Sequence, residues 1–322
     1  MIKFLIVGFG NAGKRHFSNI KKLKVGKEIA ILETKRNKWE LEKLKNLKII
    51  KSKKEIKNYK PDVVIISSPA TYHLKQANFF CDLKSSLIIE KPLSIDYYGI
   101  KKLNRKIINN SLFCLVGYNL IFLPSLIKFK QLLSSQKYGI PYKFEIIHET
   151  FMPSWRKKNY KKVVSSQKKL GGGILLELSH EFHYAYWILK NFKFINGFVD
   201  KISNYDSDVE DFCDLNFIVD NKSFTKCILN IKIDFFSKNN QRRIIVYTNK
   251  GILSWDYLLK NVIFYKFNGR KKILYNQIEN NDISYTNQLS FFLKNYKNNK
   301  VGIYDFDINY NVLKLINNIK KL

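Results

Sequence analysis

The stretch Ile2-Lys3-Phe4-Leu5-Ile6-Val7-Gly8-Phe9-Gly10-Asn11-Ala12-Gly13-Lys14-Arg15-His16 carries the strongest structural signal in this chain. An apolar run typical of a buried strand leads into three glycines, and apolar residues at helical spacing follow. A strand, a glycine-rich turn and a helix in this order form a dinucleotide-binding fingerprint, in which the phosphates meet backbone N–H groups where the helix begins. The residues predicted to surround the phosphates are Gly8, Gly10, Asn11, Ala12 and Gly13.

An acidic residue ends the second predicted strand, which covers residues 29–33. The Glu33 carboxylate is expected to accept hydrogen bonds from the ribose hydroxyls of adenosine. Its negative charge favours NAD, because it would repel the 2′-phosphate of NADP. Lys35 and Arg36 follow at once and could receive such a phosphate, so NADP remains open. A chance recurrence of three glycines is the competing interpretation, but it leaves the strand, the helix and Glu33 unexplained.

The net charge of +31 reflects 57 Lys and Arg residues against 26 Asp and Glu residues. Such a charge raises the alternative of a nucleic-acid-binding protein, because basic surfaces gain affinity for phosphates by counterion release. The lysines are spread through every segment, however, and Ile, Asn, Phe and Tyr are also abundant, as in genes rich in A and T. No helix-turn-helix, zinc-finger or RNA-binding signature is present. We therefore expect no nucleic-acid partner, and a positive field that favours anionic ligands.

The cysteines and the hydrophobic pattern indicate a cytoplasmic protein. The four cysteines are far apart and form no C-x-x-C pair, which predicts buried free thiols in a reducing compartment. No run of 18 apolar residues occurs, so we expect no membrane span, and the N-terminus lacks the cleavage region of a signal peptide. With 322 residues, of which 45% are apolar, the chain is expected to fold into two domains.

Strands alternate with helical patterns through the first 120 or so residues. Predicted strands cover residues 2–7, 29–33, 61–67, 86–90 and 112–117, and predicted helices cover residues 12–23, 37–45, 71–81 and 95–109. The strands are almost wholly apolar, as strands of a parallel sheet are when helices cover both faces. Residues 1–121 are therefore predicted to form a doubly wound α/β domain with the Rossmann arrangement.

The pattern changes near Pro124, where a helix over residues 125–135 is expected. Apolar and polar residues then alternate in 142–148, 213–217 and 226–231, which is typical of strands with one buried face. We therefore predict an α+β domain over residues 122–322, with a large, open, mostly antiparallel sheet.

Five short motifs occur in a fixed order along the chain. They are Gly8-x-Gly10-x-x-Gly13-x-x-His16, Ser68-Pro69-Ala70-Thr71-Tyr72-His73, Glu90-Lys91-Pro92, Gly117-Tyr118-Asn119, and Gly171-Gly172-Gly173 before a helix that contains histidine. In this order and spacing they resemble the Gfo/Idh/MocA family of NAD(P)-dependent oxidoreductases. The resemblance covers most of the chain and implies hydride transfer by a nicotinamide cofactor. It also implies a set of further cofactor-binding residues: Ser68, Pro69, His73, Glu90, Lys91 and Asn119.

Lys91 resembles the catalytic lysine of that family. It follows a parallel strand at the carboxyl end, where such sheets bind ligands, and it could hold a substrate hydroxyl by a hydrogen bond. In a chain this rich in lysine, an exposed lysine before a proline is the plainer interpretation of Lys91 taken alone. The Lys91-Pro92 peptide bond is a candidate for the cis form.

A helix over residues 174–190 is predicted to place four polar or amphipathic side chains on one face: Glu177, His180, Glu181 and Tyr184. That face either meets solvent or lines a cleft in which His180 accepts a proton or holds the substrate. The family commonly has an Asp four residues before its His. Here Glu177 precedes His180 by three, so the role of Glu177 stays open. A metal site at Glu177, His180 and His183 has no supporting ligand pattern, so no metal is expected.

The segment from Trp155 to Leu170 resembles a branch of the family linked to bacterial surface-polysaccharide and nonulosonic-acid pathways. Arg156 is suited to a carboxylate or phosphate, and Trp155 and Tyr160 are suited to stack on a sugar ring. A solvated basic loop explains the segment equally well. The residues assigned to substrate by resemblance are Lys91, Tyr118, Trp155, Arg156, Tyr160, Glu177 and His180. For His16 and His148 a structural role is the safer interpretation.

The sequence thus predicts an NAD(P)-dependent dehydrogenase or reductase acting on the CH–OH group of a sugar or nucleotide sugar. Lys91 would polarise the oxygen and His180 would relay its proton. A homodimer or homotetramer through the second domain's sheet is expected, because one face of that sheet needs covering. Two alternatives remain: a non-catalytic nucleotide binder with the same fold, and a basic nucleic-acid-binding protein.

Overall fold

The computed structural model describes residues 2–34, 47–155, 160–221, 224–280 and 282–321, and the structural statements below concern these. Their contacts divide the chain into two units. Unit 1 comprises Met1–Tyr118 and Tyr285–Lys314, and unit 2 comprises Asn119–Ser284 and Leu315–Leu322. The sequence predicts one boundary, between residues 121 and 122. In the structure, the C-terminal segment returns to unit 1, where Phe292 lies 5.4 Å from Phe113 between ring centroids.

Unit 1 is built on a seven-stranded parallel sheet in the order β15-β6-β5-β4-β1-β2-β3. Its strands are β1 (Ile2–Val7), β2 (Gly26–Leu32), β3 (Lys48–Ile50), β4 (Val63–Ile66), β5 (Ser86–Ile89), β6 (Phe113–Val116) and β15 (Gly302–Ile303). Its helices are α1 (Asn11–Leu23), α3 (Lys53–Tyr59), η1 (Ala70–Tyr72), α4 (His73–Asp82) and α5 (Ile100–Asn109), and most of α9 (Ile283–Lys297) and α10 (Phe306–Ile319).

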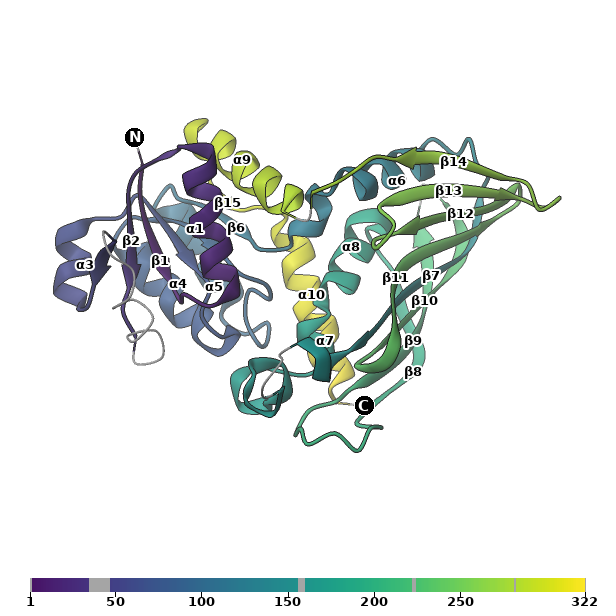
Figure 1. Ribbon diagram of the computed structural model, residues 1–322, viewed down its shortest axis with the longest axis horizontal. Coiled ribbons are helices and arrows are strands. Elements are labelled where there is room, and N and C mark those ends of the chain that lie inside the picture. Colours follow the sequence, from purple (N-terminus) through teal and green to yellow (C-terminus); the bar gives the residue numbers. More distant parts are fainter. Residues whose placement is uncertain (1, 35–46, 156–159, 222–223, 281, 322) are drawn as a thin grey trace. The chain divides into compact units, whose positions relative to one another are not determined.

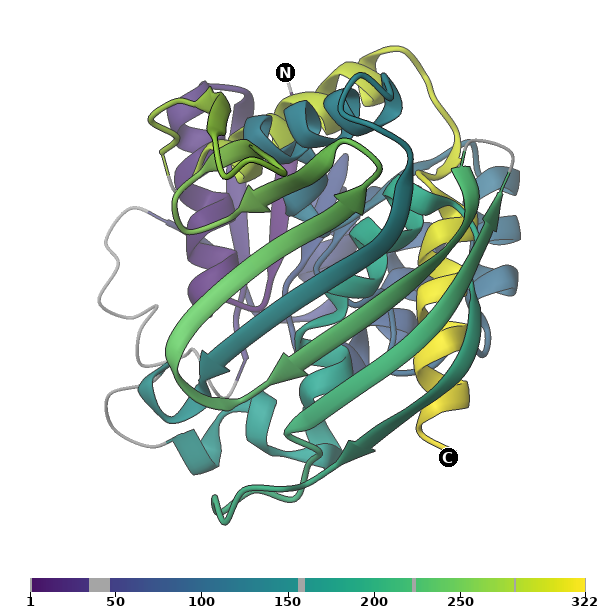
Figure 2. The ribbon, with the colours of Figure 1, turned by 90° about the vertical axis from the view of Figure 1, so that its right-hand side faces the viewer.

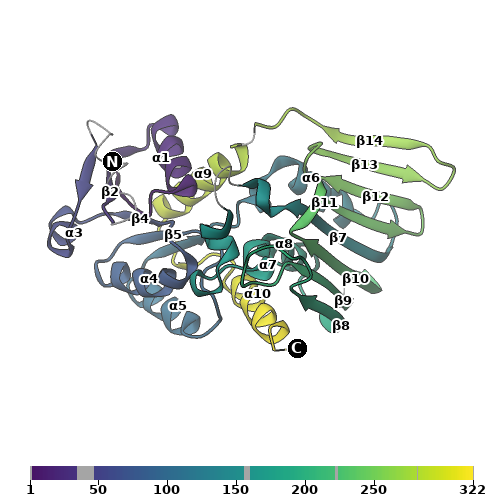
Figure 3. The same cartoon turned by 60° about the horizontal axis from the view of Figure 1, so that its bottom comes forward.

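Helices cover both faces of this sheet, which explains its apolar strands. α1 and α9 lie on one face, and α4 and α5 lie on the other (Figure 1 and Figure 3). Every residue of β4, β5 and β6 is therefore buried. The five strands predicted for this part of the chain are confirmed. The predicted helix over residues 37–45 lies outside the described residues, and the one predicted from residue 95 begins only at Ile100, after Gly99 at a φ of 74°.

Unit 2 holds an eight-stranded sheet in the order β14-β13-β12-β11-β7-β10-β9-β8. Its strands are β7 (Pro141–Phe151), β8 (Lys193–Asp200), β9 (Phe212–Asn221), β10 (Phe224–Asp234), β11 (Phe236–Thr248), β12 (Gly251–Asp256), β13 (Asn261–Lys266) and β14 (Lys271–Asn276). Its helices are η2 (Asn119–Phe122), α6 (Pro124–Ser134), η3 (Met152–Trp155), η4 (Tyr160–Lys162), η5 (Val164–Ser166), η6 (Lys168–Leu170), α7 (Ile174–Glu177) and α8 (Ser179–Leu189).

Only β7 and β10 pair in parallel, and the other neighbours are antiparallel. This confirms the predicted fold class, a Rossmann sheet followed by an α+β domain. α6 and α8 lie on one face of the unit 2 sheet, which we call the inner face (Figure 1). Side chains at alternating positions of the central strands are buried there, as Phe144 and Ile146 of β7 are.

The outer face of the unit 2 sheet is seen in Figure 2. Polar side chains on its central strands pair with one another. Tyr247 Oη donates to Glu145 Oε2 at 3.0 Å, and Gln241 Nε2 donates to Glu149 Oε2. Apolar side chains are exposed as well, at Ile228 of β10 and at Ile195 and Phe198 of the edge strand β8.

No helix within the described residues is both long and apolar enough to cross a membrane. All four cysteines are buried free thiols, as the sequence predicts: Cys81, Cys114, Cys213 and Cys227.

Candidate active site

The glycine turn after β1 combines two closely packed positions with one open position, as a Cβ placed on each glycine shows. At Gly8, with a φ of 90°, a Cβ would lie 2.6 Å from the Ser67 carbonyl oxygen, and at Gly13 it would lie 2.1 Å from the Gly8 carbonyl oxygen. Both glycines are therefore required by close packing. At Gly10 a Cβ would meet no protein atom within 4 Å, so this position faces open space.

The first turn of α1 has the properties of a phosphate site. Gly10 is its N-cap and offers no side-chain cap, and the turn contains no acidic residue. Its leading N–H groups thus have no anionic competitor on their own helix, and the helix dipole favours a phosphate there. The open side of Gly10 and this helix start fit a pyrophosphate. Glu33 follows β2, and its N–H donates to the Ile50 carbonyl at 2.8 Å. Lys35 and Arg36 lie outside the described residues.

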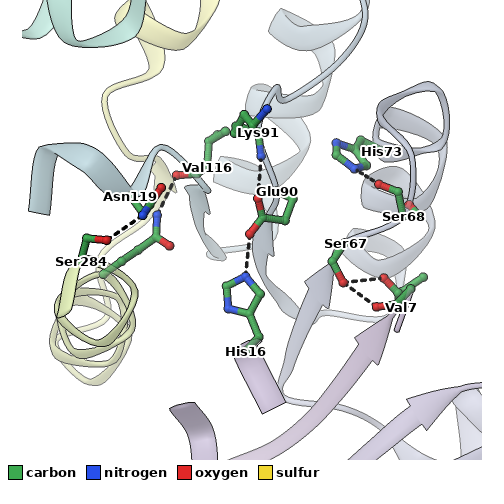
Figure 4. Close-up of polar contacts among 12 residues, drawn as sticks. Val7, His16, Ser67, Ser68, His73, Glu90, Lys91, Val116, Asn119 and Ser284 are labelled. Atoms are coloured by element: carbon green, nitrogen blue, oxygen red, sulfur yellow. Dashed lines mark hydrogen bonds and ion pairs between the residues drawn. The ribbon is translucent and has the colours of Figure 1, made fainter. Parts of the chain in front are cut away.

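A serine-containing loop after β4 closes over the same turn. Ser67 Oγ donates to the carbonyl oxygens of Gly8 at 2.6 Å and Val7 at 3.2 Å (Figure 4). The next residue, Ser68, donates through its hydroxyl to Gln76 Oε1 at 2.6 Å. This loop and β1 therefore hold each other at the carboxyl end of the sheet, where parallel sheets bind ligands.

His73 braces two loops of unit 1. Its Nδ1 lies 2.9 Å from the Pro92 carbonyl oxygen, and its Nε2 lies 2.7 Å from the Ser68 carbonyl oxygen. Burial lowers the pKa of His73 against the opposing effect of these two carbonyls. Both ring nitrogens thus face backbone, so His73 joins the loop after β4, with Pro69, to the loop after β5.

Glu90 and Lys91 follow β5 directly. His16 Nε2 of α1 lies 2.8 Å from Glu90 Oε1, and the Lys91 backbone N–H donates to Glu90 Oε2 at 3.3 Å (Figure 4). Burial acts to raise the pKa of Glu90, but the hydrogen bond from His16 and the nearby charges outweigh it and lower the pKa. The Lys91-Pro92 peptide bond is cis. A buried carboxylate therefore links α1 to the backbone of Lys91.

In unit 2, the triple glycine before α7 packs against the backbone of the segment that precedes it. A Cβ on Gly172 would lie 2.2 Å from the Val164 carbonyl oxygen, and one on Gly173 would lie 2.5 Å from Glu210 Oε1. The Gly173 N–H donates to the Ser165 carbonyl at 3.1 Å. The triple glycine and the segment before it thus form one packed unit, because residues 164–167 can approach the glycines this closely only where side chains are absent.

The aromatic residues of that segment have defined partners. Trp155 Nε1 donates to Thr150 Oγ1 at 3.0 Å, and the Tyr160 hydroxyl accepts a hydrogen bond from the Asp206 N–H at 3.2 Å. Trp155 is only partly covered, with 36% of its surface exposed. Arg156 lies outside the described residues.

The motif Gly117-Tyr118-Asn119 lies where the two units divide. Tyr118 is buried in unit 1, and Asn119 Nδ2 of unit 2 donates to Ser284 Oγ at 2.7 Å.

The predicted helix over residues 174–190 is two helices, α7 and α8, which meet at Leu178. The polar face predicted for it is wrong in part. Glu177 and His180 are half-buried, but Glu181 and Tyr184 are fully buried. The reason is an ion pair, because Glu181 meets Arg242 of β11 at 2.7 Å. A helical wheel places every carboxylate on the solvent-exposed face of the helix, because it cannot take into account an oppositely charged residue on a distant strand.

Sequence reasoning also missed the loop over residues 201–211. Four acidic residues lie within six positions of it: Asp206, Asp208, Glu210 and Asp211. Asp206 pairs with Lys161 at 2.5 Å, and Asp208 accepts from the Lys168 N–H at 2.7 Å. Burial raises the pKa of Glu210 beside Gly173. A compact acidic cluster in so basic a chain was the available signal that this loop binds the basic segment.

Matches to two protein-family models decide the family. Residues 2–118 match the Gfo/Idh/MocA oxidoreductase family with its NAD-binding Rossmann fold, and residues 126–254 match the Gfo/Idh/MocA C-terminal domain. This chain belongs to the Gfo/Idh/MocA family. Residues 2–118 of this family member are its NAD-binding Rossmann domain. No curated protein sequence matches the chain significantly.

Solved structures similar to this Gfo/Idh/MocA protein share its fold over nearly its whole length. UDP-N-acetylglucosamine 3-dehydrogenase GnnA from Acidithiobacillus ferrooxidans is 14% identical, with a TM-score of 0.76 over 99% of this chain and 97% of that chain. GenD2 from gentamicin A biosynthesis, in complex with NAD, is 15% identical, with a TM-score of 0.79 over 99% and 93%. Levoglucosan dehydrogenase with NADH and levoglucosan is 14% identical, with a TM-score of 0.80 over 99% and 96%.

The predicted site residues of this Gfo/Idh/MocA protein fall into two groups. Unit 1 holds the glycine turn, Ser68, His73, Glu90 and Lys91, whereas Trp155, Tyr160, Glu177 and His180 belong to unit 2. Within the described residues, no cluster of three or more His, Cys, Asp or Glu side chains is arranged to hold a metal ion.

Proposed function

We propose that this family member is an NAD-dependent dehydrogenase or reductase acting on the CH–OH group of a sugar or nucleotide sugar, in surface-polysaccharide biosynthesis. The observation that carries the proposal is the position of Lys91. It follows β5 in the NAD-binding domain, and its backbone N–H meets the Glu90 carboxylate that His16 binds. The dehydrogenases of similar fold that act on sugars add support for this substrate class.

In the direction of oxidation, the Lys91 ammonium would donate a hydrogen bond to the substrate hydroxyl oxygen and stabilise its developing negative charge. His180 would accept the hydroxyl proton. The chemistry that bound NAD⁺ supplies is acceptance of the hydride from the carbinol carbon. The O–H and C–H bonds break and the carbonyl bond forms. The hydride takes two electrons to NAD⁺, and the hydroxyl proton passes separately to His180. The proposal requires Lys91 and His180 to act on the same substrate molecule.

The cofactor would be held by the loops after β2, β4 and β5 of unit 1, by the glycine turn with the start of α1, and by Asn119. The residues proposed for it are Gly8, Gly10, Asn11, Ala12, Gly13, Glu33, Ser68, Pro69, His73, Glu90, Lys91 and Asn119. Glu33 would bind the adenosine ribose, whereas Lys35 and Arg36 would admit NADP. The substrate would meet Tyr118, Trp155, Arg156, Tyr160 and Glu177 in addition to Lys91 and His180. A cytoplasmic location belongs to the same proposal, because the buried thiols remain reduced there.

A homodimer or homotetramer through the unit 2 sheet is also part of the proposal. Ile195 and Phe198, both exposed on β8, support it at the edge of the sheet. Light scattering of the wild type and of Phe198→Asp tests this point. A monomeric wild type would refute it.

The reaction is tested with a panel of sugars and nucleotide sugars, offered with NAD or NADP and followed by nicotinamide absorbance. Lys91→Ala is expected to lower kcat/KM at least ~100-fold while NAD binding persists. Lys102→Ala, on the exposed side of α5, is the matched control and should behave as the wild type. A wild type inactive with every sugar and both cofactors would overturn the proposal. NAD binding with unchanged cellular output in Lys91→Ala would favour the non-catalytic alternative.

A further inference from the structure

Three polar side chains of unit 2 meet beneath α8, and we call them the inner polar cluster: His148 of β7, Glu181 of α8 and Arg242 of β11. His148 and Arg242 are directly paired across the two strands. Glu181 Oε1 lies 2.9 Å from His148 Nδ1 and 2.7 Å from both Nε and Nη2 of Arg242. His148 and Arg242 lie on the inner face of the sheet, two positions beyond the apolar pair Ile146 and Ile244.

The charge on Glu181 is fixed by this cluster. The side chain has 0% of its surface exposed, so a carboxylate there requires a compensating charge. Burial acts to raise the pKa of Glu181, but the Arg242 guanidinium and His148 outweigh it and lower the pKa to about 2. Glu181 is therefore an anion at neutral pH, and its Oε1 is the acceptor that faces the imidazole of His148.

The two nitrogens of His148 have different surroundings. Nδ1 is buried at an ion-pair distance from Glu181, whereas the side chain as a whole retains 14% of its surface exposed. Nε2 makes no hydrogen bond or ion pair with the described residues and is not one of the buried polar atoms, so this edge of the ring reaches the surface. A carboxylate at Nδ1 stabilises the tautomer with its proton on Nδ1, which leaves the lone pair on Nε2.

The exposed edge of His148 belongs to the part of unit 2 that carries the proposed substrate residues. Thr150, two positions along β7 and on the same face, accepts the hydrogen bond from Trp155 Nε1 at 3.0 Å. Glu181 is the next residue after His180 on α8. The inner polar cluster thus adjoins both the segment that begins at Trp155 and the helix that bears His180.

We propose that His148 is a second acid–base residue of this enzyme, with Nε2 facing a substrate hydroxyl and Glu181 acting as its positioning residue. The inference rests on the proposed function. In oxidation one proton leaves the substrate hydroxyl: the O–H bond breaks, His180 relays the proton, and the proton ends in an N–H bond at Nε2 of His148, while the Nδ1 proton stays on Nδ1. The imidazolium formed is balanced by the Glu181 carboxylate, as in carboxylate-oriented histidines of other enzymes.

The charges around His148 suit this role. Burial lowers the pKa of His148, and the Arg242 guanidinium lowers it further, against the opposing effects of Glu181 on α8 and Asp234 on β10. The ring is therefore neutral at pH 7 and competent to accept a proton. Protonation at lower pH would block this function, so the acid limb of the kcat/KM profile reports it.

His148→Asn is the decisive variant, because its amide nitrogen can still donate to Glu181 at the position of Nδ1 while Nε2 is removed. The expected result is a fall in kcat/KM of about 100-fold, carried by kcat, with the acid limb of the pH profile lost. Glu149→Gln, on the outer face of the same strand, is the matched control and should keep both rate and profile. Unchanged kinetics in His148→Asn, in an enzyme that Lys91→Ala inactivates, would overturn this inference alone.

A second readout needs no substrate. Nitrogen NMR of the imidazole in the wild-type protein at pH 7 should show a protonated Nδ1 and an unprotonated Nε2 for His148. Glu181→Gln should shift the proton toward Nε2, because an amide can donate to Nδ1. A proton on Nε2 in the wild type would refute the orientation by Glu181. A wild type with the expected tautomer but no activity toward any sugar would instead refute the proposed function, and the acid–base role with it.

Discussion

Gly10→Ala separates NAD binding from folding in unit 1. The Gly10 φ of −79° is accessible to alanine, and a Cβ there meets no protein atom within 4 Å. Replacing an N-cap glycine by alanine costs roughly 0.5–1 kcal/mol, and the reduced freedom of the unfolded chain offsets about 0.4–1 kcal/mol of this. The free energy of unfolding should therefore change by less than about 1 kcal/mol.

NAD affinity should respond quite differently. The added methyl group would occupy the open side of the turn, where the pyrophosphate approaches the backbone. We expect at least a tenfold rise in the Kd for NAD, about 1.4 kcal/mol. Gly13→Ala is the contrasting variant, because its Cβ would lie 2.1 Å from the Gly8 carbonyl oxygen. Relief of such an overlap costs about 1–3 kcal/mol, so this variant should lose stability as well as affinity.

The assay pairs thermal unfolding with calorimetric titration of NAD and NADH on the wild type and both variants. The reasoning predicts an unchanged Tm with weakened binding for Gly10→Ala, and a lowered Tm for Gly13→Ala. Wild-type affinity in a folded Gly10→Ala protein would refute the placement of the pyrophosphate at this turn. A large decrease in the Tm of Gly10→Ala would refute the claim that a methyl group at this position meets no protein atom.

Three further predictions concern burial. Folding lowers the pKa of Glu181 to about 2, so the carboxylate stabilises the fold fully above its unfolded-state pKa, and this stabilisation, about 3 kcal/mol, is lost as pH falls through the folded-state pKa. The free energy of unfolding of Glu181→Gln should therefore depend less on pH between about pH 5 and 2 than that of the wild type. The same pH dependence in both proteins would contradict this. Burial raises the pKa of Cys81 to about 12 and of Cys227 to about 11, and Cys114 and Cys213 are raised as well, so a thiol reagent at pH 8 should label the cysteines only after unfolding, whereas rapid native labelling would refute their burial. Trp255 is fully buried and its Nε1 donates to Ser125 Oγ at 3.0 Å, so Trp255→Ala should lower the free energy of unfolding in urea by about 3–5 kcal/mol, and a loss below about 1 kcal/mol would show that the site is loosely packed.

Local patterns were sufficient to predict the two sheets and the glycine turn. The strands of unit 1 are apolar because both faces of their sheet are covered, and this composition is visible residue by residue. The glycine turn is equally local, since a side chain at Gly8 or Gly13 would overlap backbone within a few residues or at the neighbouring strand, whereas Gly10 faces open space. Such features can be predicted because their causes lie close together in the sequence or repeat with a fixed period.

Long-range pairings could not be predicted in this way. The return of residues 285–314 to unit 1 involves contacts such as that of Phe292 with Phe113, for which the sequence has no local signal. The burial of Glu181 depends on Arg242, sixty-one positions away. His148 is predicted to be structural from its place on a strand, and the Glu181 carboxylate 2.9 Å from its Nδ1, which the acid–base proposal uses, has no local signal in the sequence. Helix and strand periodicity predict which residues share one face of an element, but they do not predict which charged residue of a distant element will contact that face.

The central claim is that a sugar carbinol carbon passes its hydride to NAD through a site that depends on Lys91. The most direct test offers sugars deuterated at their carbinol carbons, with NAD, and measures deuterium in the NADH formed by mass spectrometry. The account predicts deuterium at the nicotinamide ring with the wild type and with Lys102→Ala, and none above background with Lys91→Ala. Deuterium-free NADH from the wild type with every sugar, or full transfer by Lys91→Ala, would contradict it.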